Sequence, residues 1–220
     1  MKLHCSALAL LLAVVSGVPA AAAAAAAAAP ATTAAPATTA APATTAAPAT
    51  TAVLPPDSVL RLDGDFTDQD GRAFSFPARR GRVQLVTMFY TSCKVMCPLI
   101  VDSGLGVDHA LTPAERGKLR VLFVSLDPAR DTAARLDALA TQRKLDRHRW
   151  TLARTDAASV RKTAAVLGVR YRALANGEFN HSSVLILLDA DGRIVARTEK
   201  MGRVPDPEFL AKVRATLSKS

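Results

Sequence analysis

The sequence has little cysteine and few aromatic residues. Three cysteines occur in 220 residues, and aromatic side chains make up 5% of the chain. A structural zinc site takes four cysteine or histidine ligands in paired spacings, and no second such pair accompanies Cys93 and Cys97. Zinc of this kind is therefore not expected. The scarcity of aromatic rings for base stacking argues against nucleic-acid binding, despite a formal net charge of +9. We expect this charge to favour acidic partners or anionic lipid.

A long apolar run is also missing from the N-terminus. Residues 1–20 combine Lys2, the apolar run ALALLLAVV and small residues, which is the pattern of a signal peptide. The run is shorter than the roughly 20 apolar residues that span a bilayer. We predict an exported, periplasmic protein; an uncleaved anchor in the inner membrane is the alternative, because polyalanine follows the run. Cys5 precedes the apolar run, so we interpret it as a passive signal residue.

Residues 21–52 have the composition of a linker. Proline recurs every six residues, at Pro30, Pro36, Pro42 and Pro48, with only alanine and threonine between. Such low-complexity sequence offers no apolar face to bury, and proline favours extended, semi-rigid chain. This leaves residues 53–220 for one folded domain.

Residues 53–220 alternate between predicted strands and helices. Asp70-Gly71 lies between two alternating runs, 61–67 and 73–77, and predicts an N-terminal β-hairpin. Apolar, β-rich runs predict strands at 83–90, 119–126, 150–153 and 184–188, the last joined through Asp191-Gly192 to a partner at 193–198. Helices are expected from about 98 (interrupted by Gly104 and Gly106), 113, 131, 156 and 206. This order predicts an α/β, thioredoxin-like fold with an N-terminal β-hairpin and a second hairpin inserted or terminal.

The sharpest local feature is TSCKVMCP at residues 91–98, directly after a predicted buried strand. Cys93 and Cys97 have the i, i+4 spacing that places two side chains on one face of a helix. A strand-to-helix junction supplies free N–H groups that favour the thiolate. Metal binding, thiol–disulfide exchange and a structural disulfide all suit such a pair, so the spacing alone leaves the three readings open.

His181 favours the metal reading. It precedes the buried strand 183–188, and in a thioredoxin-like sheet the loop before that strand passes beside the cysteine loop. Two thiolates and one imidazole form a soft set that suits Cu(I) and also allows Cu(II). Dithiol oxidoreductases usually carry a cis-proline in this loop, and none stands next to Ser182 or Ser183. His109 and His148 lie in helical or surface contexts and are not expected to bind metal.

Three motifs in order resemble the SCO/SenC family of copper chaperones: YTSCKVMCP at 90–98, VSLDPARDT at 124–132 and FNHSS at 179–183. The resemblance implies a thioredoxin-like fold, copper bound by Cys93, Cys97 and His181, and copper delivery to, or thiol reduction of, the dinuclear copper centre in the copper-bearing subunit of cytochrome c oxidase. The family commonly has Pro-Asp and an aliphatic residue between the cysteines, whereas this chain has Lys94, Val95 and Met96.

Two aspartates of the second motif have separate expected roles. Asp127 follows a central strand, where functional groups gather in α/β sheets, so it is a candidate for a residue behind the metal ligands or at a partner contact. Asp131 with Thr132 is most simply a helix start.

Overall fold

The computed structural model describes residues 53–220. The predicted signal peptide (1–20) and linker (21–52) lie outside the described residues. Within the described part, no helix is long and apolar enough to cross a membrane.

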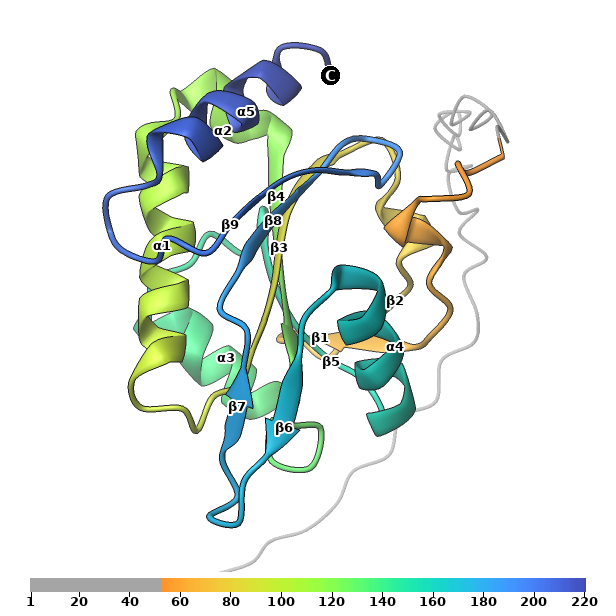
Figure 1. Ribbon diagram of the computed structural model, residues 1–220, viewed down its shortest axis with the longest axis vertical. Helices are drawn as coiled ribbons and strands as arrows, with labels where there is room; N and C mark the ends of the chain where they lie inside the picture. The colour runs from red at the N-terminus through yellow and green to blue at the C-terminus, as the bar shows by residue number, and fades with distance from the viewer. Residues whose placement is uncertain (1–52) are drawn as a thin grey trace, which may run out of the picture. The chain divides into compact units, whose positions relative to one another are not determined.

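A seven-stranded mixed sheet forms the centre of the domain, with strand order β2-β1-β5-β4-β3-β8-β9 (Figure 1). Its strands are β1 (Phe66–Asp68), β2 (Ala73–Phe74), β3 (Val83–Phe89), β4 (Leu119–Ser125), β5 (Trp150–Arg154), β8 (Leu185–Leu188) and β9 (Ile194–Thr198). The central strands β3, β4 and β5 are parallel, and β8 pairs with β3 antiparallel. A separate two-stranded hairpin joins β6 (Tyr171–Ala173) to β7 (Phe179–His181).

Helices cover both faces of the sheet. They are α1 (Met96–Ala110), α2 (Pro113–Lys118), α3 (Ala133–Gln142), α4 (Ala157–Leu167) and α5 (Pro207–Leu217). Residues of α1, α3 and α5 pack into the core on one side of the sheet and residues of α4 into the core on the other (Figure 1). Two short 3-10 helices, η1 (Val59–Arg61) and η2 (Pro77–Arg79), flank the first hairpin. Side-chain caps fix several helix starts, including the reciprocal Thr112 and Glu115 capping box of α2.

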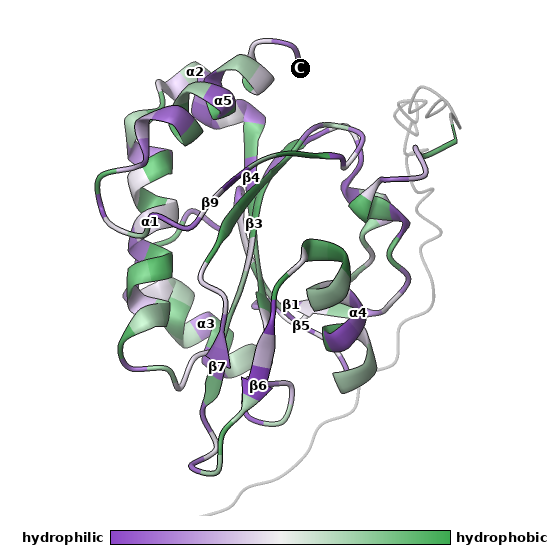
Figure 2. Cartoon of the chain, in the orientation of Figure 1, coloured by the Kyte–Doolittle hydropathy of each residue, from purple (hydrophilic) through white to green (hydrophobic). Residues whose placement is uncertain are grey.

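Strand β3 divides two hydrophobic cores. Its residues Leu85 and Phe89 pack on the side of α1, α3 and α5, while Val86 and Met88 pack on the side of α4. All seven residues of β3 are buried, so its apolar residues occupy both faces and the sequence does not alternate. Its two polar side chains are also buried, and they hydrogen-bond to the backbone carbonyls of Arg79 (from Gln84) and Val184 (from Thr87). The apolar colouring of the inner strands in Figure 2 follows this two-sided burial.

The thioredoxin-like arrangement, the N-terminal hairpin β1–β2 and the terminal hairpin β8–β9 confirm the sequence predictions. The inserted hairpin β6–β7 was not located by sequence pattern. The expected interruption at Gly104 and Gly106 is wrong, because α1 continues through both. A Cβ at Gly104 would lie 2.9 Å from the Trp150 ring, and one at Gly106 would lie 2.3 Å from the Arg203 carbonyl oxygen. The two glycines therefore allow close packing instead of ending the helix.

Candidate metal and thiol site

Strand direction brings three distant segments to one end of the sheet. Because β3 and β4 are parallel, the loops that follow them leave at the same edge. Because β8 runs antiparallel to β3, the chain that enters β8 arrives at that edge as well. Figure 1 shows the β6–β7 hairpin, which precedes β8, beside the loop that leads into α1. The cysteine motif, the 126–132 loop and His181 thus meet.

The two cysteines occupy different environments. Cys93 lies in the loop before α1 and is partly buried, whereas Cys97 lies in the first turn of α1 and is 3% exposed. The sequence predicts a helix from about residue 98, whereas α1 begins at Met96 with Val95 as its N-cap, so Cys97 is helical and Cys93 precedes the helix. The Cys97 N–H still donates to the Cys93 Sγ (3.2 Å), and the Tyr90 N–H donates to the Cys97 Sγ (3.4 Å). Both thiols are free.

The pKa values of the two thiols shift in opposite directions. Burial by itself would raise the pKa of Cys93, but hydrogen bonds from the Cys97 and Val95 backbone, and from the Cys97 side chain, lower it overall. Burial raises the pKa of Cys97 strongly, and the hydrogen bond from the Tyr90 backbone only partly offsets it. Cys93 is therefore the more readily ionised and more accessible thiol of the pair.

His181 presents one ring nitrogen to this sulfur pair. Its Nε2 lies 3.7 Å from the Cys97 Sγ, and its Nδ1 lies 3.0 Å from the Ser182 carbonyl oxygen. A carbonyl only accepts hydrogen bonds, so the Nδ1 carries the proton and the Nε2 lone pair faces the sulfur. Burial lowers the pKa of His181 although the bond to Ser182 opposes the shift, which keeps the imidazole neutral and able to ligate.

The separation of these two atoms fits shared coordination. Sulfur and nitrogen ligands at about 2.3 and 2.0 Å from one metal lie about 3.5–3.7 Å apart for tetrahedral to trigonal angles. Across residues 53–220, however, no three side chains of His, Cys, Asp and Glu stand close enough together to hold a metal ion as they are. Cys97 and His181 are nevertheless at a distance that suits one metal ion, and Cys93 lines one hollow with Cys97 and another with His181.

Tyr90 attaches the His181 hairpin to the sheet. Its hydroxyl donates to the Phe179 carbonyl and accepts from the Phe179 N–H, both at 3.3 Å, and its ring meets the His181 ring edge-on at 5.8 Å between centroids. Sequence reasoning did not single out Tyr90. The available signal was an amphipathic aromatic residue at the end of a buried strand, directly before the cysteine motif.

Asp127 reaches the hairpin indirectly. Its side chain is 5% exposed and pairs with Arg130, whose guanidinium also donates to the Gly177 carbonyl at the β6–β7 turn. Gly177 has φ +78°, a conformation that favours glycine, and Asn176-Gly177 was the turn signal from which this hairpin could have been predicted. Asp127 thus lies behind the hairpin turn and not against the sulfurs.

Asp131 has a different role from the expected helix start. Thr132 is the N-cap of α3 and accepts from the Arg135 N–H, while the Asp131 carboxylate points inward. This fully buried carboxylate accepts from the N–H (3.1 Å) and the hydroxyl of Thr91 and from the Ser125 hydroxyl (2.5 Å). Asp131 therefore fixes the start of the cysteine loop. Two other histidines of residues 53–220, His109 and His148, are exposed on α1 and in a turn.

Comparison with known proteins agrees with this arrangement. A family model described as SCO1/SenC matches residues 57–218, and no curated protein matches. Among solved structures, the chain is similar to copper-bound ScoI of Bradyrhizobium japonicum (24% identity, 70% of this chain and 96% of that one, TM-score 0.59). It is also similar to a SCO1/SenC family lipoprotein of Bacillus anthracis (20%, 70% and 94%, 0.63) and to copper-bound yeast Sco1 (20%, 71% and 87%, 0.57). The chain belongs to the SCO1/SenC family.

Proposed function

We propose that this protein is a copper metallochaperone that takes up one copper ion through Cys93, Cys97 and His181. The observation that carries the proposal is the 3.7 Å approach of the His181 Nε2, held in its neutral form, to the Cys97 Sγ. Two sulfurs and one imidazole nitrogen form a donor set that prefers copper among the biological metals. The copper in the Bradyrhizobium and yeast structures supports the same cargo.

The residues of the site have different roles in binding and releasing copper. Cys93, partly exposed and readily ionised, meets the incoming ion first, whereas Cys97 loses its proton when the metal arrives. Tyr90 and the Arg130 contact at Gly177 hold the hairpin so that His181 is the third ligand. The two sulfurs suit Cu(I), and the imidazole also allows Cu(II). Copper leaves by ligand exchange with an acceptor protein.

We propose the copper-bearing subunit of cytochrome c oxidase as the acceptor, on the basis of family membership. The protein would work outside the cytoplasm, in the periplasm, with residues 1–52 serving as an export signal and a linker or tether. The description of the Bacillus anthracis relative as a lipoprotein supports export and attachment to a membrane.

Copper titration of the reduced full chain tests the three-ligand site. We expect one Cu(I) per chain, with His181→Ala losing affinity because the third ligand is gone, and His148→Ala, an exposed histidine outside the site, leaving affinity unchanged. Competition with a chromogenic Cu(I) chelator measures both. Equal affinity of parent and His181→Ala contradicts the three-ligand site.

The unequal cysteines favour one alternative, a thiol–disulfide oxidoreductase. The Cys93 thiolate would attack a partner disulfide and release one partner thiolate; the Cys97 thiolate would then attack the Cys93 sulfur, leaving an oxidised Cys93–Cys97 pair and a reduced partner. On this alternative, Cys97→Ser traps a mixed disulfide and Cys93→Ser does not. Weak copper binding together with such trapping would favour the alternative over the chaperone.

A further inference from the structure

Two exposed apolar side chains stand beside the reactive sulfur. Val95 is 77% and Met96 39% exposed; Val95 is the N-cap of α1 and Met96 is its first residue. Neither side chain belongs to either hydrophobic core. Methionine and exposed apolar groups next to a reactive centre are typical of surfaces that contact another protein.

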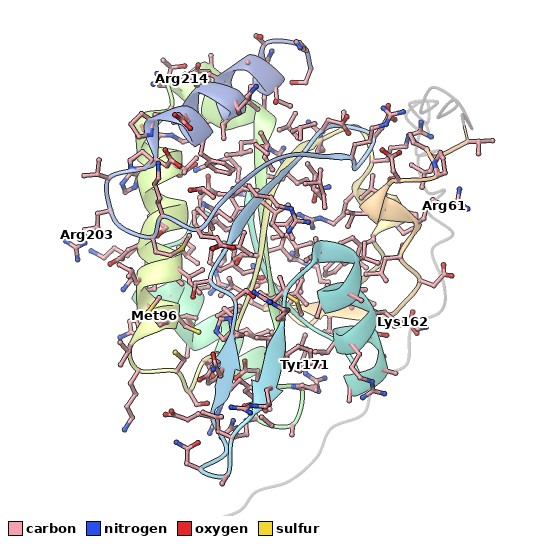
Figure 3. All side chains as sticks on the ribbon, in the orientation of Figure 1. Arg61, Met96, Lys162, Tyr171, Arg203 and Arg214 are labelled. Atoms are coloured by element: carbon pink, nitrogen blue, oxygen red, sulfur yellow. The ribbon has the colours of Figure 1, made fainter. Side chains whose placement is uncertain are left out.

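A hollow of about 200 Å³ separates this loop from the β6–β7 hairpin. Lys94, Val95 and Met96 line one side, Glu178 and Phe179 line the other, and Cys93 and His181 are reached between them. Figure 3 shows Met96 at the start of α1 and Tyr171 on β6, at the end of the sheet opposite Arg214 on α5. A segment that enters the hollow would therefore meet the candidate ligands directly.

The surface around the hollow is positively charged. Lys94, Arg170 and Arg172 are exposed, and none of them forms an ion pair within the described part of the chain. Arg170 and Arg172 line a second hollow of about 410 Å³ that also includes His181. The first hollow has one acidic lining residue, Glu178, and the second has none. Three unpaired cations against one acid create a field that attracts anionic groups toward His181.

We propose that this surface, formed by Lys94, Val95, Met96, Arg170 and Arg172, docks a protein loop that carries a cysteine pair flanked by acidic side chains and an apolar residue. The inference rests on the proposed function and specifies the acceptor. Acidic groups complement the three cations, the apolar residue covers Val95 and Met96, and the cysteines replace the ligands of this chain on Cu(I). Copper keeps its oxidation state; the two acceptor sulfurs replace the Cys93 and Cys97 sulfurs, the His181 nitrogen is released as a neutral imidazole, and Cys93 and Cys97 take up the two protons that the acceptor thiols release.

Copper transfer from the loaded full chain to a synthetic peptide tests this surface. The peptide carries a Cys-x-x-x-Cys pair, a leucine and a tryptophan between flanking glutamates, and its counterpart carries lysine in place of every glutamate. Stopped-flow quenching of the tryptophan reports copper arrival. We expect the acidic peptide to receive copper about tenfold faster at about 20 mM salt, and this preference to shrink at about 300 mM, where charges are screened over a few ångströms.

Reversing a charge on the proposed surface tests whether that surface causes the faster transfer to the acidic peptide. Arg172→Glu should remove most of the preference for the acidic peptide while Cu(I) affinity stays unchanged, because Arg172 is not a ligand. Lys212→Glu makes the same charge change on α5, at the other end of the sheet, and should leave the preference intact. Val95→Ser should slow transfer to both peptides.

Three results would overturn the proposal. They are equal transfer rates for the two peptides, an equal loss from Lys212→Glu, and an effect of Arg172→Glu on anionic phospholipid vesicles with none on the acidic peptide. A chain that takes up no Cu(I) fails at the loading step, which refutes the proposed function and is distinguishable from failed docking.

Discussion

Replacing Arg130 with methionine tests how the His181 hairpin is held. The Arg130 guanidinium bridges the Asp127 carboxylate and the Gly177 carbonyl at the hairpin turn. Its side chain is 38% exposed, whereas that of Asp127 is 5% exposed. The methionine retains the aliphatic packing but leaves a nearly buried carboxylate without its counter-charge.

The expected loss of folding stability in Arg130→Met follows from the exposed fractions of these two side chains. An unpaired buried acceptor costs about 1–3 kcal/mol, and the partial exposure of Arg130 places the expected loss near the middle, at about 2 kcal/mol. For a domain of this size, that corresponds to a fall in Tm of about 4–8 °C. Adding Asp127→Asn removes the stranded charge, so the double variant should recover about 1 kcal/mol.

Urea denaturation of reduced, metal-free protein measures the stability of both single variants and of the double variant. Arg161→Met, at an exposed position on α4, is the matched control and should change stability by less than about 0.5 kcal/mol. Loosening the hairpin should also weaken copper binding, because His181 is then held in the binding position for less of the time. A loss of about 1.4 kcal/mol in the free energy that holds the hairpin in place lowers copper affinity by at most about tenfold. Additive effects of Arg130→Met and Asp127→Asn, or an Arg130→Met variant as stable as the control, would refute the reasoning.

Three further outcomes are expected. Brief iodoacetamide treatment should label Cys93 before Cys97, because their pKa values shift in opposite directions; equal labelling in peptide mass spectra would contradict this. Gly106→Ala should cost about 1–3 kcal/mol by overpacking, whereas Gly117→Ala, with open space around it, should not destabilise; calorimetry compares them. The pKa of Asp156 is lowered to about 2 by hydrogen bonds from the Ser159 side chain and neighbouring backbone. Its stabilisation of α4 is thus present above the unfolded pKa of about 3.9 and is lost as the pH falls toward 2, so the Tm difference between parent and Asp156→Ala should narrow over that range.

Local physical chemistry explains what could be predicted from the sequence alone. A mostly apolar run such as 83–90, with apolar residues at both odd and even positions, is stable only when both its faces are covered, so it predicts a central strand. Caps such as Thr112 act on the N–H groups of their own helix, and Asp70-Gly71 sets the turn of its own hairpin. The cysteine motif likewise follows its strand directly, so the position of the pair at the end of a central strand and the fold class were both predictable.

Contacts between distant residues were decided by the tertiary structure. His181 reaches the Cys97 sulfur because β8 runs antiparallel to β3, and a strand's direction is set by its partners rather than by its own residues. Gly104 continues a helix because the Trp150 ring lies against it. The Asp131 carboxylate turns inward because it accepts hydrogen bonds from buried donors on two other segments, at Thr91 and Ser125. The residues next to Asp131 in the sequence do not indicate these contacts.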